Sequence, residues 1–182
     1  MDQKRGIGKN GKIPWHIRDD LIKLKSLTKD HIVILGRKTY DSMVWYYNKS
    51  GKPMPGRLYI VITRDEKYKP ARDNAVVAHS LQEALELVKE KHLRGAYPVT
   101  SEVAERTPPR WSLGTENEIF IIGGGQIFAQ ALPLADKLYL TIVEGDYDCD
   151  TFFPDYSAFK KIIHEESKES EGHKYKFLEL ER

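Results

Sequence analysis

Five short apolar runs recur along the chain, each bounded by polar or turn-forming residues. Most of them are apolar at consecutive positions, which is typical of strands that helices cover on both faces. Their lengths and their content of β-branched residues favour strands over helices. We therefore expect strands at 31–35, 58–63, 75–78, 118–122 and 137–143.

Between these runs, apolar residues recur at the spacing of a helix. This spacing covers residues 19–27, 80–90 and 126–132, with Ser80 as a suitable N-cap for the second helix and Pro133 directly after the third. Because strands that alternate with helices form an α/β sheet, the pattern predicts that class, with helices flanking the sheet.

Two regions depart from this alternation. Residues 159–167 and 173–182 predict two more strands joined by a polar turn, so that a closing hairpin makes the sheet mixed. Residues 91–117 contain three prolines and no sustained period, and we expect a long inserted loop there. This insertion could be a lid, a partner-binding loop or a passive surface insertion.

The composition limits the possible functions. A chain of 182 residues fits one domain with a sizeable core. Its 29 lysines and arginines against 27 acidic residues give a net charge of +2, too small for a nucleic-acid-binding surface. With the single cysteine Cys149 and no clustered cysteine and histidine spacing, neither a disulfide nor a metal site is expected. We find no apolar run of membrane-spanning length and no secretory signal, so we expect a soluble cytoplasmic protein.

The stretch IPWHIRDDLIKLK, residues 13–25, contains the best acid–base candidate. At about 100° per residue, Asp20 falls on the apolar face of the predicted helix. A carboxyl group there is costly to bury unless it is hydrogen-bonded or used in catalysis. Alternatively, the helix dipole alone favours an aspartate in a first turn. The neighbouring Asp19 is expected to point away and to pair with Lys23 at the surface.

Two strand-to-helix junctions have the residue types that bind phosphate. At the first, Gly36 precedes Arg37, Lys38 and Thr39, which places cationic side chains beside backbone N–H groups. At the second, three consecutive glycines at 123–125 allow a pyrophosphate to approach the backbone. Neither junction matches a P-loop or a Rossmann fingerprint. Either could be an ordinary turn, but the two together favour a nucleotide site.

Two arginines stand at the ends of the run at 58–63. Arg57 precedes it and Arg64 follows it. An arginine beside a ligand groove can hold a carboxylate in bidentate fashion, although a solvated surface arginine is the commoner case.

Together these residues closely resemble the dihydrofolate reductase family. The matching stretches occur in the family's order and cover nearly the whole chain. They are GIGKNGKIPWHIRDDLIKLK, VILGRKTYDSM, MPGRLYIVITR, IFIIGGGQIFAQALPLADKLYLT, DTFFPDY and YKFLELER. The resemblance implies an eight-stranded, mostly parallel sheet in a single domain over residues 1–182. It also implies a monomer that binds NADPH, dihydrofolate and antifolate-type ligands and forms tetrahydrofolate by hydride transfer.

The resemblance also implies roles for the residues around the substrate. Asp20 would hold the amino and amide edge of the pterin and promote protonation of the ring nitrogen. Thr141 would support that carboxylate, and Trp15 would lie beside an ordered water. Arg57 would bind the glutamate carboxylate of the substrate. The apolar part of the pocket would be lined by Leu21, Leu24, Met43, Met54 and Ile122.

The cofactor residues implied by the resemblance form four groups. Gly36, Arg37, Lys38 and Thr39 would hold phosphates, and Thr63 and Arg64 would bind the adenosine 2′-phosphate end. Gly124, Gly125, Gln126 and Ile127 would lie at the pyrophosphate, and Ile7 and Gly8 would begin a mobile loop over the nicotinamide.

The chain departs from the family pattern in three places. Only MDQKR precedes Gly6 where the family has a central apolar strand, so we expect a shortened first strand, an abbreviated chain start or another segment in that place. The second departure is the insertion at 91–117. The third is the stretch at 45–53, whose aromatic residues we expect in a packed surface loop or against the substrate tail.

Two other functions are compatible with the same residues. One is a nucleotide-binding protein of this fold that lacks folate reductase activity. The other is a reductase of another pterin or of a pyrimidine intermediate of flavin synthesis. Asp20 together with Arg57 favours a folate, because a substrate without the glutamate tail has no use for Arg57.

Overall fold

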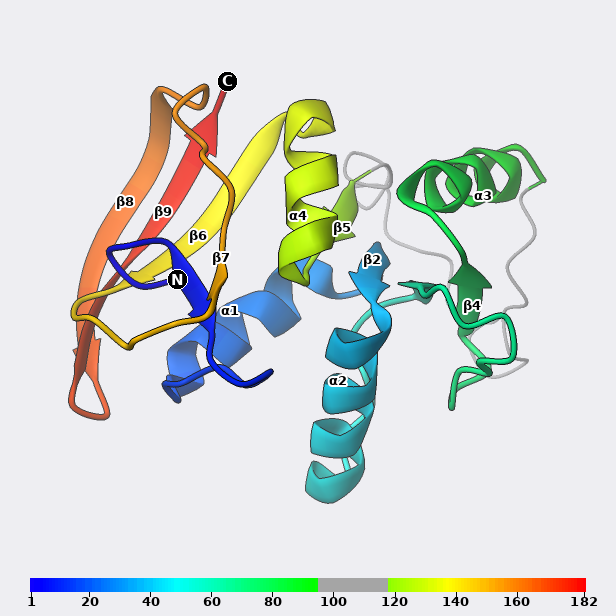
Figure 1. The fold of residues 1–182 in the computed structure, drawn as a ribbon, viewed down its shortest axis with the longest axis horizontal. Helices are drawn as coiled ribbons and strands as arrows, with labels where there is room; N and C mark the ends of the chain where they lie inside the picture. Colours follow the sequence, from blue (N-terminus) through cyan, green and yellow to red (C-terminus); the bar gives the residue numbers. More distant parts are fainter. Residues whose placement is uncertain (95–117) are drawn as a thin grey trace, which may run out of the picture. The chain divides into compact units, whose positions relative to one another are not determined.

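The computed structural model describes residues 1–94 and 118–182 (Figure 1). The chain divides into two compact units. The first consists of residues 1–27 and 123–182, and the second of residues 28–122. Each unit has its own sheet and its own apolar core.

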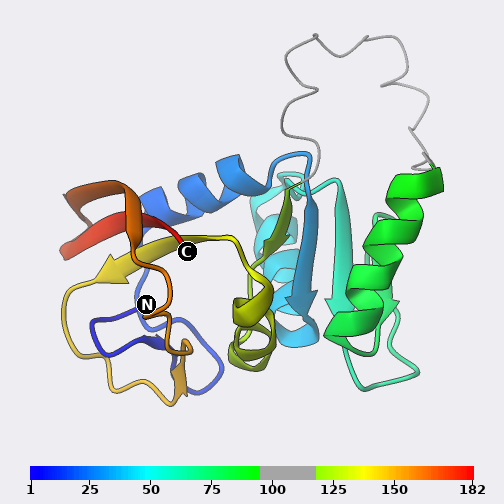
Figure 2. The same cartoon turned by 90° about the horizontal axis from the view of Figure 1, so that it is seen from above.

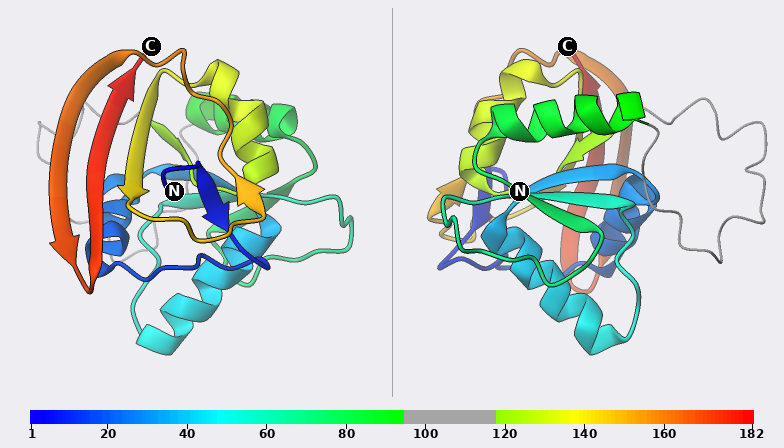
Figure 3. Two further views of the ribbon diagram at one scale, coloured as in Figure 1. Left: turned by 60° about the vertical axis from the view of Figure 1, so that its left-hand side comes forward. Right: turned by 90° about the vertical axis from the view of Figure 1, so that its right-hand side faces the viewer.

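The second unit contains a parallel sheet of four strands. Its strands are β2 (Ile32–Gly36), β3 (Leu58–Ile62), β4 (Ala75–Ala78) and β5 (Ile119–Ile121), in the order β4-β3-β2-β5. Helices α2 (Arg37–Ser50) and α3 (Leu81–Arg94) lie on opposite faces of this sheet (Figures 1 and 3). Because both faces are covered, β2 and β3 are buried at four consecutive positions each, as their unbroken apolar runs predict.

The first unit contains an antiparallel sheet of three strands. They are β6 (Lys137–Val143), β8 (Lys161–Ser170) and β9 (His173–Glu181), in the order β6-β9-β8. Figure 2 shows β8 and β9 as the hairpin in orange and red beside the yellow β6. A separate antiparallel pair joins β1 (Gly6–Gly8) to β7 (Thr151–Phe152). The helices are α1 (Arg18–Thr28), α4 (Gly125–Ala131) and the 3-10 turn Leu132–Leu134.

Two apolar clusters form the core of the first unit. One packs Leu138 and Leu140 of β6 against Leu178 and Leu180 of β9. The other lies on the α1 side of the sheet and contains Ile17, Val143, Tyr175 and Phe177. The second cluster therefore supports the start of α1.

The N-terminal residues lie along β6. Asp2 makes a parallel bridge to Val143, and the backbone nitrogen of Met1 donates to the carbonyl oxygen of Thr141 at 2.6 Å. Asp2 is buried, and its carboxylate accepts hydrogen bonds from the backbone N–H groups of Lys4 and Gly6.

The α/β class with a parallel sheet flanked by helices is confirmed, and so is the C-terminal hairpin. The expected single sheet of eight strands is wrong: in the described residues the strands form a parallel sheet of four, an antiparallel sheet of three and a separate pair. The sequence-based elements agree with the observed bounds, with two corrections. However, α3 continues to Arg94, so residues 91–94 belong to a helix and not to the inserted loop; residues 95–117 lie outside the described residues.

The second correction concerns the aromatic stretch that begins at Trp45. These residues form the second half of α2 and not a surface loop. The helix continues to Ser50 because the following Gly51 supplies the left-handed C-cap, with φ of 65° and its N–H bonded to the carbonyl of Asn48.

Candidate active site

The Asp20 carboxylate lies in the first turn of α1, where the helix dipole favours a negative charge. Its Oδ1 accepts a hydrogen bond of 2.6 Å from the Thr141 hydroxyl of β6. Both residues are partly buried. The structure thus brings together two of the three residues predicted to be catalytic, although they are separated by 121 positions in the chain.

Asp19 also faces the sheet, which corrects the expected surface pair with Lys23. The hydroxyl of Tyr175 in β9 donates to Asp19 Oδ2 at 2.9 Å. Lys23 instead lies over the ring of Phe177, with its Nζ 4.1 Å from the ring centroid. The physical reason is that the buried Tyr175 hydroxyl needs an acceptor, and Asp19 is the acceptor that α1 presents.

Tyr175 was not identified from the sequence as a site residue. Burial, then the hydrogen bond to Asp19 and the charges of Asp19, Asp20 and Glu171, raise the pKa of Tyr175 to about 12. Its hydroxyl therefore stays protonated at neutral pH and acts as a hydrogen-bond donor. The sequence feature that could have identified it is the alternation of apolar and polar residues in HKYKFLELE, which places Tyr175 on the same face of the strand as Phe177.

Trp15 lies just before α1. Its ring contacts that of Tyr147 edge to face, with the centroids 4.9 Å apart, and the Tyr147 hydroxyl lies 3.0 Å from His173 Nδ1. Trp15 also packs against the cluster that contains Ile17 and Tyr175. It is thus held on the same side of the sheet as the start of α1.

The predicted substrate residues are divided between the two units. Leu21 and Leu24 are partly buried in α1 of the first unit. In the second unit, Met43, Met54 and Ile122 pack against the core cluster around Val33 and Tyr59. Arg57 is exposed, and its backbone N–H donates to the carbonyl of His31 at 2.9 Å.

In the second unit, the predicted phosphate residues gather at one end of the parallel sheet. Gly36 ends β2 beside Ile62, the last residue of β3, so the segments 36–39 and 63–64 leave the sheet side by side. Gly36 is the N-cap of α2 and has no side chain to cap the first N–H groups. This arrangement offers backbone donors to an anion at the carboxyl ends of the strands.

The side chains at this end of the sheet differ in exposure. Arg37 forms an ion pair of 3.1 Å with Asp65, and the buried Thr63 accepts the Asp65 backbone N–H at 3.2 Å. Lys38 and Arg64 are exposed, and Thr39 is partly buried in the first turn of α2. Sequence reasoning did not identify Asp65, whose carboxylate orients Arg37.

In the first unit, the predicted glycines start α4 beside β1 and β7. Gly124 is the N-cap without a side-chain cap, and the bond between Gly123 and Gly124 is cis. A Cβ on Gly125 would lie 3.0 Å from a methyl carbon of Thr151 and 3.8 Å from Cδ1 of Ile7. Glycine therefore allows this close approach, which brings Ile7 next to the start of α4. Of the following residues, Gln126 is exposed and Ile127 is buried.

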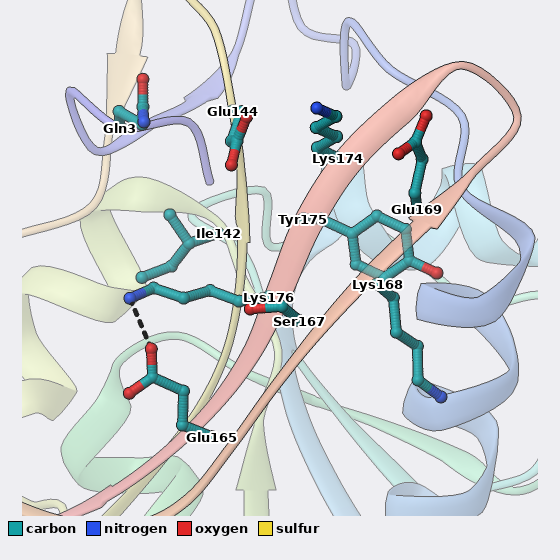
Figure 4. Close-up of a pocket in the computed structure, with 10 residues that line it drawn as sticks. All are labelled: Gln3, Ile142, Glu144, Glu165, Ser167, Lys168, Glu169, Lys174, Tyr175 and Lys176. Atoms are coloured by element: carbon teal, nitrogen blue, oxygen red, sulfur yellow. Dashed lines mark hydrogen bonds and ion pairs between the residues drawn. The ribbon is translucent and has the colours of Figure 1, made fainter.

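The first unit also has a concavity of about 550 Å³ on its three-stranded sheet (Figure 4). Three lysines and three glutamates are among its lining residues, and Lys176 pairs with Glu165 at 2.8 Å. None of the predicted site residues is among those that line it. Within the part of the chain that the structure describes, we find neither a cluster suited to hold a metal ion nor a helix able to cross a membrane.

A model of the dihydrofolate reductase family matches residues 1–182. The chain belongs to the dihydrofolate reductase family. It is 31% identical over 179 residues to the dihydrofolate reductase of Staphylococcus haemolyticus, covering 97% of this chain and 87% of the relative. It is 30% identical over 188 residues to that of Bacillus subtilis, covering 100% and 90%.

A solved dihydrofolate reductase has the same fold. This is the enzyme from Enterococcus faecalis in complex with NADP(H) and RAB-propyl, with a TM-score of 0.71 at 25% identity over 100% of this chain and 92% of that one. The family that the sequence motifs predict is therefore confirmed. The assignment as an oxidoreductase, specifically a dihydrofolate reductase, is confirmed with it.

Proposed function

We propose that Asp20 and Thr141 form the substrate-protonating centre of this dihydrofolate reductase. The reaction is the reduction of 7,8-dihydrofolate to tetrahydrofolate, in which NADPH supplies the hydride and a proton reaches the adjacent ring nitrogen. The observation that supports this role is the hydrogen bond of 2.6 Å that fixes Asp20 on α1 to Thr141 on β6.

The chemistry of a carboxylate fits the pterin. The amino group and the neighbouring ring N–H of a pterin are adjacent, coplanar donors, and a carboxylate has two oxygens that accept such a pair in bidentate fashion. Oδ1 of Asp20 accepts the Thr141 hydroxyl and retains a further lone pair, so both oxygens can accept bonds from the pterin. A carboxylate held in this way orients the ring and can relay a proton to it through water.

We further propose which residues hold the cofactor. In the second unit these are Gly36, Arg37, Lys38 and Thr39 for phosphate, and Thr63 and Arg64 for the 2′-phosphate. The residues fit an anionic ligand because the first N–H groups of α2 have no side-chain cap and the helix begins with the cations Arg37 and Lys38. In the first unit, Gly124, Gly125, Gln126 and Ile127 would meet the pyrophosphate, and Ile7 and Gly8 the nicotinamide.

Arg57 is proposed to bind the glutamate carboxylate of the substrate. Its exposed side chain follows the turn at Pro55 and Gly56 and is therefore accessible to a charged tail. The apolar body of the substrate would contact Leu21, Leu24, Met43, Met54 and Ile122. In this proposal the two units act together as one domain, as a cytoplasmic monomer that also binds antifolate-type ligands.

The test is NADPH oxidation in the presence of dihydrofolate by the wild type and by Asp20→Asn, with Asp136→Asn as the matched control at an exposed aspartate of the same unit. We expect Asp20→Asn to lower kcat/KM at neutral pH about 100-fold or more, while the control behaves like the wild type. Near-normal turnover by Asp20→Asn would contradict the assignment. A wild type that binds NADPH without turnover would support the alternative of a nucleotide-binding protein.

A further inference from the structure

The Tyr175 hydroxyl has a fixed place beneath the start of α1. Tyr175 is 2% exposed and lies in β9 directly opposite Val143 of β6. In Figure 4 its ring extends from β9 away from Ile142 and Lys176, with the hydroxyl at the far end. That hydroxyl donates to Asp19 Oδ2 at 2.9 Å.

The first turn of α1 is therefore attached to the sheet at two consecutive side chains. Thr141 of β6 bonds Asp20, and Tyr175 of the neighbouring β9 bonds Asp19. In the β6–β9 register Thr141 pairs with Phe177, two residues along β9 from Tyr175. One hydrogen bond would allow the turn to rotate about it, whereas two bonds to different strands fix the position and rotation of the turn.

The hairpin turn between β8 and β9 adds a third contact at the same helix end. The backbone N–H of Arg18, the first residue of α1, donates to Glu171 Oε2 at 2.9 Å. Glu171 is exposed, whereas Tyr175 is buried among apolar side chains of the cluster that includes Ile17 and Phe177. The Tyr175 bond is partly buried, whereas the bond from Arg18 to Glu171 is exposed, so the Tyr175 bond is the better protected of these two restraints on the helix end.

We propose that Tyr175 is a positioning residue for the reaction: by donating to Asp19, it holds the first turn of α1 so that the Asp20 carboxylate meets the pterin in the productive orientation. This inference rests on the role proposed above for Asp20. Displacement of a reacting group by about 1 Å can cost roughly 100-fold in rate, so a residue that never touches substrate can still control turnover.

The test compares three single variants. Tyr175→Phe removes only the hydroxyl, Asp19→Ala removes the acceptor, and Asp19→Asn keeps a carbonyl oxygen that can accept the same bond. We expect Tyr175→Phe and Asp19→Ala each to lower kcat/KM for dihydrofolate about tenfold, the kinetic equivalent of one hydrogen bond to a charged group. Asp19→Asn should retain most of the wild-type kcat/KM, because its side-chain carbonyl oxygen still accepts the bond. The KM for NADPH should stay within about twofold in all three.

The combination of Tyr175→Phe with Asp19→Ala provides the second readout. Because both changes remove the same bond, the double variant should be no slower than either single variant. Additive losses would contradict the proposal. So would a Tyr175→Phe protein that melts at a lower temperature but retains the wild-type kcat/KM, since the hydroxyl would then be structural only. If Asp19→Asn is as slow as Asp19→Ala, the charge of Asp19 matters and not its bond to Tyr175, and the proposal is wrong.

Asp20→Asn is measured in the same series to separate this proposal from the previous one. An active Asp20→Asn enzyme would refute the role of Asp20 itself. An inactive Asp20→Asn enzyme beside a fully active Tyr175→Phe enzyme would refute only the positioning role of Tyr175.

Discussion

The sheets of the two units place their functional groups in different ways. In the parallel sheet of the second unit, helices cover both faces, and the strands β2 and β3 are buried and apolar. Its candidate residues therefore lie where strands end, at Gly36 and Thr63. In the antiparallel sheet of the first unit, β8 is exposed at nine of its ten positions. In the other two strands of this sheet, the side chains of Thr141 in β6 and Tyr175 in β9 donate hydrogen bonds to the carboxylates of α1.

The difference follows from the cost of burying polar groups. A strand packed on both faces cannot accommodate a hydroxyl without a hydrogen-bond partner. The polar functional groups therefore lie at the ends of the strands, where backbone N–H groups of the following helix are available. A sheet with a more open surface tolerates hydroxyls on its strands, provided that a helix supplies acceptors. The second unit is thus suited to bind phosphate groups at the ends of its strands, and the strands of the first unit are suited to orient the carboxylates of α1.

The largest expected contrast between the sheets is in stability. Ile34 in β2 is fully buried, whereas Ile162 in β8 is 59% exposed. Ile34→Ala should lower the free energy of unfolding by about 3 kcal/mol, because it removes methyl groups from a closed core. Ile162→Ala should change it by less than about 0.5 kcal/mol. Urea unfolding of both variants measures the contrast, and equal losses would mean that the two sheets are not packed differently.

A smaller contrast is expected at alkaline pH. Burial is the main cause that raises the pKa of Tyr59 in the second unit and of Tyr175 in the first, each from 10.0 to about 12. Between these pH values the unfolded chain loses protons that the folded protein keeps, so stability is intact below pH 10 and falls as the pH rises toward 12. At about pH 11 each tyrosine should account for about 1 kcal/mol of that loss.

Phenylalanine variants would separate the two tyrosines. Each should show a smaller alkaline loss than the wild type. At neutral pH, Tyr59→Phe should be the more destabilised, because it leaves the buried Gly56 N–H without the Tyr59 oxygen that accepts it at 2.7 Å. Asp19 is partly exposed, so water can replace the hydroxyl lost in Tyr175→Phe. The test is the free energy of unfolding of each variant at neutral pH and at about pH 11. If both variants lose as much stability at the alkaline pH as the wild type does, the assigned origin of the pKa shifts is wrong.

Sequence reasoning was most successful where the signal is local. Unbroken apolar runs predicted β2 and β3, and helical spacing placed Asp20 toward the sheet. The junction at Gly36 was recognisable because a glycine and two cations follow a buried strand without a break. In each case, the residues that determine the structure are close together in the chain.

It failed where the partner is distant. The hydroxyl that bonds Asp19 comes from a residue 156 positions away, so spacing along one helix could only suggest the nearby Lys23. The aromatic residues from Trp45 were assigned to a loop, but α2 continues through them to Ser50 and ends at the left-handed Gly51. Asp65 was missed because its ion pair with Arg37 joins two strand ends that only the parallel register brings together.

In our proposal Asp20 of the first unit orients the substrate, whereas Arg64 of the second unit binds the 2′-phosphate end of the cofactor. Calorimetric titration of Asp20→Asn and Arg64→Ala, each with NADPH alone and with a diaminopyrimidine antifolate alone, tests it most directly. We expect Asp20→Asn to lose antifolate affinity about 100-fold and to bind NADPH within about twofold of the wild type. Arg64→Ala should lose about tenfold in NADPH affinity and bind the antifolate normally. Unchanged antifolate binding by Asp20→Asn, or loss of both ligands in both variants, would contradict the account.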